Sequence, residues 1–378
     1  LLGVEGSSSG ARTAIITGQA LPQSFAHSKL HSKVRQQIFD SSLGNVVRNV
    51  IPLQFRGQDY CLFEAACAGG LSSFWGQQFV RLTAADFDAT ATLIGDFERY
   101  NSACDVIEQG LRLQQSGLAI RDKLAGWDVT IRSARLVTPI DAFAQLFHSV
   151  SKAACVQHQR VDRIEPAGEA GYKLICEGGS ELIAKKVILA AGLVATARIL
   201  VKSSRRLRYI RFSDHAPYLF HTMAWSHQLL RRFGDRAQNM NALTIELAQS
   251  ERSSAYLSVY DLREVPANLV LAQLGLPMAR ILRGRKASAL QLPYYPIQAW
   301  TSGSTAEIEL TYNDSEDRLV GTQCEVQNDD EGLELVRRAL RLCGFTTLYH
   351  SVTPPGLGFH HHALRLSEDG ANYEDATT

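Results

Sequence analysis

The sequence predicts an α/β (α+β) fold, in which a Rossmann-like domain is joined to a second, β-rich antiparallel domain. The first part rests on residues 186–200, where an apolar, β-branched run ends in Ala-Ala-Gly and passes into a helical pattern. In a parallel sheet such a strand is buried on both faces, and the small residues let the backbone turn tightly. The second part rests on residues 255–260 and 306–312, whose alternating pattern is typical of antiparallel strands.

A strand and a hairpin are predicted upstream of the Ala-Ala-Gly turn. Residues 154–164 are typical of a strand, and residues 172–177 and 181–184 of two paired strands. Gly178 and Gly179 stand between these two segments, where a tight two-residue turn favours glycine. The chain then feeds directly into the predicted strand at residues 186–190.

Further helices are predicted from apolar residues at helical spacing. Residues 329–343 give the clearest amphipathic pattern, with Gly344 as the C-terminal cap and four inward positions, Leu333, Val336, Leu340 and Leu342. The other expected helices cover residues 86–115 (as one or two helices), 139–147 and 268–280.

Three other segments carry residue types suited to a flat cofactor or to acid–base chemistry. Residues 67–76 combine glycines, serines and two aromatic residues, which suits a loop with accessible backbone N–H groups, or a surface loop held by one buried Trp. Residues 211–217 contain Asp214-His215, for which catalysis and an Asx turn are both open. Residues 356–366 contain the run His360-His361-His362.

In chain order these four segments resemble the glucose–methanol–choline family of FAD-dependent oxidoreductases, over residues 40–370. In that family a Gly-Gly-x-Ser segment lies along the flavin, an Ala-Ala-Gly segment closes the dinucleotide-binding domain, and a His-containing segment carries the base. The resemblance implies that FAD is the cofactor and that backbone groups at Val161 face the adenine. The implied FAD ligands are Glu5, Gly69, Gly70, Ser72, Ser73, Trp75, Gly76, Val161, Ala190, Ala191 and Gly192.

The sequence departs from the family pattern near both ends. The Gly-x-Gly-x-x-Gly turn that binds the FAD pyrophosphate is not found. Residues 1–6 resemble the second strand of the nucleotide-binding fold, so Glu5 is expected either to hold a ribose hydroxyl or to be a frayed terminal charge. Residues 7–40 predict an irregular connection. The family also continues beyond the histidine segment, so we expect a chain trimmed at both ends or a degenerate member of the family.

The histidine run supplies the candidate base. Imidazole suits proton abstraction from an alcohol because its pKa lies near neutral pH. The family base stands six residues before an Arg, and six residues before Arg365 is Phe359, so a one-residue shift assigns the base to His360 or, failing that, His361. A structural role and a metal site are the alternatives; no metal is expected, because neighbouring histidines on an extended chain point to opposite faces.

Composition limits the other function classes. The 378-residue chain has a formal net charge of +1, which gives no reason to expect nucleic acid as a partner. The seven cysteines form no Cys-x-x-Cys pair and are expected to be reduced thiols of a cytoplasmic protein. Neither a transmembrane run nor a signal peptide is recognised, so no membrane partner is expected.

The sequence therefore predicts an FAD-binding domain over residues 1–204, a substrate domain over 205–325, and a return to the FAD-binding domain over 326–378. The predicted function is oxidation of an alcohol (CH–OH donor) of a sugar or secondary metabolite, with a histidine base and hydride transfer to the flavin. Two alternatives stay open: a flavin-free scaffold or partner subunit with the same fold, and a flavin enzyme of non-oxidative chemistry.

Overall fold

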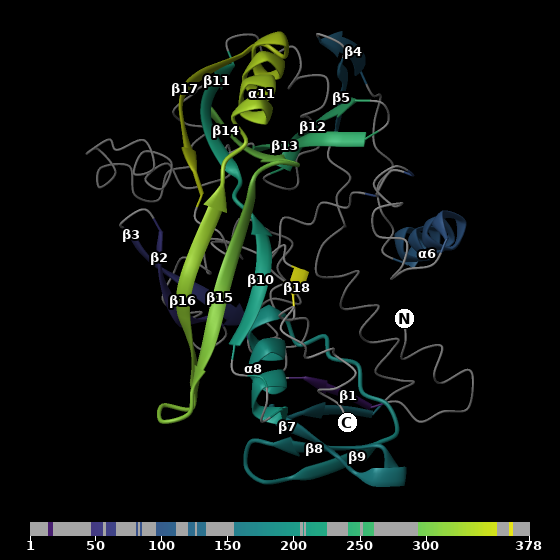
Figure 1. The fold of residues 1–378 in the computed structure, drawn as a ribbon. Coiled ribbons are helices and arrows are strands. Elements are labelled where there is room, and N and C mark those ends of the chain that lie inside the picture. Colours follow the sequence, from purple (N-terminus) through teal and green to yellow (C-terminus); the bar gives the residue numbers. More distant parts are fainter. Residues whose placement is uncertain are drawn as a thin grey trace, which may run out of the picture.

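The computed structural model describes an elongated, sheet-rich molecule (Figure 1). The described residues are 14–17, 47–55, 58–65, 81, 84, 96–110, 120–124, 127–133, 155–204, 207, 209–224, 241–249, 252–260, 294–353 and 363–365. The FAD ligands expected at Glu5 and at Gly69 to Gly76, the histidines at 360 and 361, and the helices expected at 139–147 and 268–280 lie outside these residues.

A seven-stranded antiparallel sheet forms one end of the molecule (Figure 1). Its order is β17-β11-β14-β13-β12-β5-β4, so it combines strands from all three predicted segments of the chain. The strands are β4 (Ile120–Leu124), β5 (Trp127–Ser133), β11 (Tyr218–Ala224), β12 (Asn241–Gln249), β13 (Arg252–Tyr260), β14 (Tyr294–Thr301) and β17 (Phe345–Val352).

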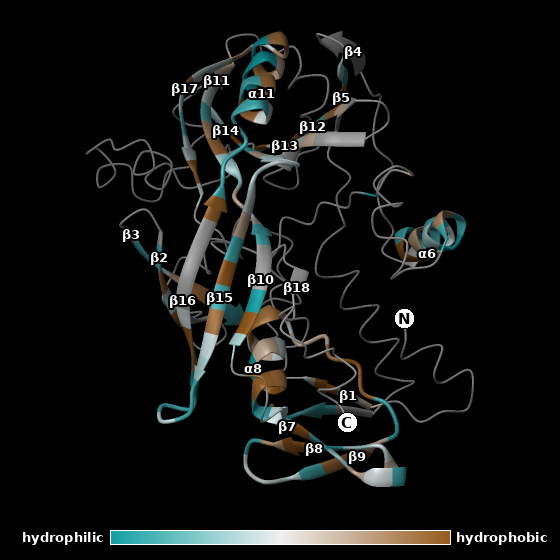
Figure 2. Ribbon diagram, in the orientation of Figure 1, coloured by the Kyte–Doolittle hydropathy of each residue, from teal (hydrophilic) through white to brown (hydrophobic). Residues whose placement is uncertain are grey.

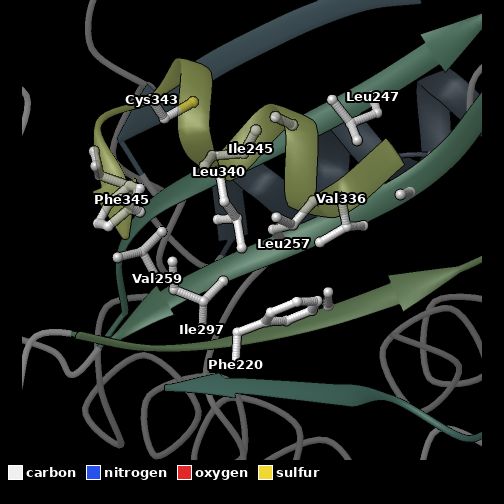
Figure 3. Close-up of a cluster of buried hydrophobic side chains, with 14 of the residues drawn as sticks. Phe220, Ile245, Leu247, Leu257, Val259, Ile297, Val336, Leu340, Cys343 and Phe345 are labelled. Atoms are coloured by element: carbon white, nitrogen blue, oxygen red, sulfur yellow. The ribbon is translucent and has the colours of Figure 1, made fainter. Parts of the chain in front are cut away.

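Helix α11 (Asp330–Leu342) covers one face of this sheet (Figure 3). Asp329 caps its start, because the Asp329 carboxylate accepts a hydrogen bond from the Gly332 N–H at 2.8 Å. Gly344 follows its end with φ of 80°, which confirms the predicted cap. Leu333, Val336 and Leu340 face the sheet as predicted, but Leu342 is 46% exposed and was wrongly placed inside.

A four-stranded sheet of order β16-β15-β10-β18 extends from the seven-stranded sheet (Figure 1). It consists of β10 (Tyr209–His215), β15 (Thr305–Asn313), β16 (Arg318–Gln327) and β18 (Ala363–Arg365). Bands of apolar and polar residues alternate along β15, as the sequence predicts (Figure 2). The hairpin β2 (Val47–Phe55) and β3 (Gln58–Ala65) shares a buried apolar cluster with this sheet and with α8 (Leu193–Ser203).

The third region contains the strands next to the expected nucleotide site. A three-stranded antiparallel sheet is built from β7 (Val161–Pro166), β8 (Tyr172–Cys176) and β9 (Glu181–Ala184), so the predicted hairpin is confirmed. Strand β1 (Ala14–Thr17) pairs in parallel with β6 (Cys155–His158), the one parallel pair among the described strands. A 3-10 turn (Gly168–Ala170) lies between β7 and β8.

Several local predictions need correction. Residues 186–190 pair with no strand in the described part of the chain, and Ile188 is 66% exposed. An apolar run indicates a tendency to be buried, but it does not supply a strand edge to pair with. Residues 154–164 form two strands, β6 and β7, which belong to different sheets, and β1 lies in a stretch expected to be irregular.

The helical pattern predicted over residues 86–115 is confirmed in its second half. Helix α6 (Phe97–Gly110) includes Phe97 and Tyr100, two apolar residues at helical spacing. Arg81 forms ion pairs of 2.6 Å with both Asp105 and Glu108 of this helix. These ion pairs link α6 to the chain at residue 81.

Candidate functional site

Pairing between β10 and β18 brings two of the sequence motifs together. In this antiparallel pair Arg211 lies opposite Arg365 and Ser213 lies opposite Ala363. Ala363, the first residue of β18, follows directly on the His360-His361-His362 run in the sequence. The chain on the C-terminal side of the histidines is therefore held beside the segment that contains Asp214-His215.

Asp214 and His215 belong to a strand, so the Asx-turn alternative is wrong. They complete β10 and pair with Ala306 and Thr305 of β15. The turn alternative failed because it rested on the tendency of an Asp side chain to bond its own backbone, whereas cross-strand pairing continues β10 up to His215. Ala216 and Pro217 then lead straight into β11, which joins the two large sheets.

The predicted Ala190-Ala191-Gly192 turn begins α8, as expected. Gly192 is the N-cap, with φ of 84° and ψ of 163°, a conformation open almost only to glycine. Gly192 has no side chain with which to cap the helix, the first turn of α8 contains no acidic residue, and residues 190–192 are exposed. In Figure 1 this end of α8 is drawn toward β10 and β18, and the other end toward β7.

Val161 is connected to α8 through Arg198. The Arg198 guanidinium lies 3.5 Å from the Val161 carbonyl oxygen and 3.2 Å from the Glu177 carboxylate. Arg160, the residue before Val161, pairs with Glu64 of β3 at 2.7 Å and with Glu177 at 3.3 Å. The structure therefore brings Val161 and the Ala190-Ala191-Gly192 helix into one ion-paired unit, together with the β2–β3 hairpin.

Lys202 ties the other end of α8 to two sheets. Its Nζ lies 2.5 Å from Asp162 of β7 and 2.7 Å from Asp317, in the turn between β15 and β16. Burial disfavours the charged ammonium, but the hydrogen bonds to Asp162 and Asp317 outweigh it and raise the pKa of Lys202. The Lys202 and Tyr312 side chains in turn lower the pKa of the Asp317 carboxyl.

The face of the seven-stranded sheet opposite α11 carries polar and aromatic side chains; we call it the polar sheet face. Alternation along each strand separates it from the apolar face, since the residues between its members belong to the core against α11. Tyr260 donates a hydrogen bond to Gln298 at 2.8 Å. The polar sheet face comprises His221 of β11, Thr244 and Glu246 of β12, Tyr256, Ser258 and Tyr260 of β13, Tyr294, Gln298 and Trp300 of β14, and Tyr349 of β17.

Three strands meet at a buried histidine on this face. His221 is 4% exposed, and its Nδ1 lies 2.6 Å from the Tyr294 hydroxyl oxygen. The His221 ring also stacks on Tyr349, with centroids 4.0 Å apart and an angle of 16° between the planes. Burial lowers the pKa of His221 and, with the nearby Tyr349, raises the pKa of Tyr294, so both groups are neutral near neutral pH.

Sequence reasoning missed these residues, although part of the signal was present. The alternation over residues 255–260 predicted β13, and its polar positions, Tyr256, Ser258 and Tyr260, lie on the polar sheet face. His221 and Tyr294 carry no local signal, because 72 residues separate them and only the pairing of β11 with β14 joins them.

The described part of the chain contains no group of three or more His, Cys, Asp or Glu side chains placed to hold a metal ion. Nor does any helix in it have the length and apolar character needed to cross a membrane.

Comparison with known proteins identifies the fold. No protein-family model and no curated protein matches the sequence. Among solved structures, pyridoxine 4-oxidase from Mesorbium loti superposes with a TM-score of 0.56 at 14% identity, covering 100% of this chain and 83% of that one. Halogenase PltM superposes with a TM-score of only 0.25 at 11% identity, and the match covers 66% of this chain and 46% of the halogenase chain. At the level of overall architecture, this chain therefore shares the fold of the pyridoxine 4-oxidase structure.

Proposed function

We propose that this chain is an FAD-dependent oxidoreductase that oxidises a small-molecule alcohol, a sugar or secondary metabolite, with His360 or His361 as the base. The observation that carries the proposal is the pairing of β10 with β18, which joins the histidine segment to the Asp214-His215 segment within an oxidase fold. Both segments, and the Ala-Ala-Gly helix start, occupy places in the chain order that the sequence resemblance to FAD-dependent oxidoreductases requires.

The described residues fit a dinucleotide such as FAD. Gly192 leaves the start of α8 without a capping side chain of its own, and a Cβ placed on Gly192 would meet no atom of the described residues within 4 Å. Arg198, which contacts the Val161 carbonyl, has a buried Nε with no hydrogen-bond partner in the described structure. The N–H groups at the start of α8 and the Arg198 Nε–H, which has no acceptor among the described residues, could both donate hydrogen bonds to the polar edge of a nucleotide.

In the proposed reaction, side chains of this protein would transfer the proton and position the substrate. Bound FAD would supply the two-electron acceptor. A neutral imidazole at His360 or His361 takes the proton of the substrate hydroxyl as hydride leaves the carbon, which leaves a carbonyl product and a protonated histidine. The proton then passes to solvent, which returns the imidazole to its neutral form.

An absorption spectrum of the purified full chain is the first test. Flavin bands, or their appearance after FAD is added to the protein and the excess removed, would support the proposal. A chain that neither contains nor takes up FAD would overturn it and would favour the flavin-free scaffold or partner subunit.

Single replacements of the histidines test the chemistry. In anaerobic protein, His360→Asn and His361→Asn should keep the flavin bands, and at least one should slow their bleaching by an alcohol about 100-fold or more. Pyridoxine and simple sugars are suitable donors to survey. Normal bleaching by both variants would exclude a histidine base in this run, and flavin that no alcohol bleaches would favour non-oxidative chemistry.

A further inference from the structure

One flank of helix α11 carries four charged side chains in a continuous row. Asp330, Glu334, Arg337 and Arg341 follow one another at intervals of four, three and four residues, so successive turns of the helix bring them onto the same flank. Asp330 and Arg341 are exposed, and the side chains of Glu334 and Arg337 are 43% and 39% exposed. We call these four residues the α11 stripe; their order is acid, acid, base, base.

The α11 stripe lies beside an edge of the seven-stranded sheet. Arg337 Nη2 is 3.5 Å from His350 Nδ1, so the middle of α11 lies against β17. Among the described strands β17 is at the edge of this sheet (Figure 1). Its eight residues include no charged residue and no proline, and Leu348 is 51% exposed. Apart from one bulge opposite β11, this edge lacks the features that keep strand edges from meeting other chains.

Ion pairs within α11 do not use up the charge of its C-terminal half. The Glu334 carboxylate is the shared partner of Arg337, Arg338 and Arg341, at 3.7, 3.2 and 3.3 Å, so one acid serves three guanidinium groups. The helix dipole favours acids near the start and bases near the end, which explains the order of the charges. It does not explain why the four residues share the flank beside β17.

The order of charges makes the α11 stripe complementary to itself. When two copies of α11 lie antiparallel about a two-fold axis, Asp330 meets Arg341 of the other copy and Glu334 meets Arg337, each twice. A parallel arrangement would place like charges together. Because α11 packs on β17 and turns directly into it, the same axis brings the two β17 edges toward each other.

We propose that a second copy of this chain docks on this face. In the symmetric dimer the two α11 stripes lie antiparallel and the two β17 edges face each other. Charge complementarity selects this occupant over an unrelated protein, since each half of the stripe is matched by the other half. The proposal is independent of the flavin chemistry, and its tests need no turnover.

Sedimentation velocity of the full chain measures the assembly. At low salt the chain should form a dimer with a dissociation constant below about 100 μM, and raising sodium chloride from about 0.02 M to about 0.5 M should weaken it about 10-fold or more. A chain that stays monomeric at low salt up to about 100 μM would overturn the proposal, as would a dimer that does not respond to salt.

Charge reversal locates the interface. Arg337→Glu should weaken the dimer about 10-fold or more, because it places like charges opposite each other at two symmetric positions. Glu334→Arg should do the same. The double variant Glu334→Arg/Arg337→Glu exchanges the two charges and should regain the affinity of the unaltered protein. A double variant that is weaker than either single variant would contradict the pairing.

Arg338→Glu is the matched control. It makes the same change in net charge on the next residue, which is exposed and lies off the α11 stripe. Its dimer should weaken clearly less than that of Arg337→Glu. Equal weakening by the two substitutions would show that net charge, and not the α11 stripe, governs the association.

Hydrogen exchange tests the part of the interface formed by β17. The amides of residues 345–352 should exchange more slowly above the dissociation constant of the dimer than below it, because the second copy then covers this edge. In Arg337→Glu the difference should be lost at the same protein concentrations. A dimer that leaves the exchange of β17 unchanged would place the interface elsewhere and overturn the proposal.

Discussion

Ser213 of β10 lies opposite Ala363 of β18, one residue after the histidine run ends. In sequence the two residues are 150 positions apart, and the antiparallel register alone brings them together. The strand pair is short, because β18 spans only Ala363–Arg365, so its few backbone hydrogen bonds are what hold this end of the histidine segment.

Leu364→Pro should therefore impair the proposed reaction without unfolding the protein. Proline removes a backbone donor and restricts φ, which disfavours pairing at the centre of β18. We expect slower bleaching of bound flavin by an alcohol, with a retained far-UV circular dichroism spectrum. Asp314→Pro is the control, at the second position of an exposed Asn313–Glu316 turn that tolerates proline. Equal loss in both variants would show that β18 has no special role.

Lys202 and Lys173 each bridge two carboxylates, but Lys202 is the more buried and should stabilise the protein more. Lys202→Met leaves Asp162 and Asp317 without their shared ammonium, and should lower the free energy of unfolding by about 1.5–3 kcal/mol. Lys173 bridges Glu165 and Glu181 at 3.3 Å on the surface, where solvent screens the charges, and Lys173→Met should cost clearly less than Lys202→Met. Urea unfolding of the two variants measures the difference; similar losses would count against the Lys202 bridge.

The packing of α11 predicts opposite results for two leucines of the same helix. Leu340 is fully buried between α11 and the seven-stranded sheet, so Leu340→Ala should lower the free energy of unfolding by about 2–5 kcal/mol. Leu342 is exposed, and Leu342→Ala should change it by no more than about 0.5 kcal/mol. Thermal or urea unfolding gives both values, and a large cost at Leu342 would contradict the helix orientation in Figure 3.

The two histidines of the seven-stranded sheet should make the protein less stable in acid. Burial lowers the pKa of His221, and burial together with Arg337 lowers the pKa of His350, below the ordinary value of 6.5. Below that pH the unfolded chain takes up protons that the folded chain refuses, so the free energy of unfolding falls as pH drops from about 6.5 toward the folded-state pKa values.

Urea unfolding at a series of pH values between about 5 and 7.5 measures this dependence. His221→Phe removes one of the two groups and should flatten the curve in this range. A slope unchanged by the substitution would show that His221 does not contribute.

Local features of the fold were predictable from the sequence. The charged and apolar sides of residues 329–343 and the pair Gly178-Gly179 determine α11 and the β8–β9 hairpin, because spacing of 3.6 residues and a two-glycine turn act within a few positions. The alternation over residues 255–260 likewise determines which side chains of β13 face the core. At Leu342 the prediction failed, because Leu340 and Cys343 form the buried face of the last turn and Leu342 lies off that face.

Only the tertiary structure decided which distant segments meet. His221, Tyr294 and Tyr349 come together from β11, β14 and β17, and the histidine segment joins β10 through β18. Residues 186–190 have the apolar run of a buried strand and still pair with none in the described chain. The physical reason is that periodicity records which face of a segment is buried, whereas partner and register depend on backbone edges and side chains far away in sequence.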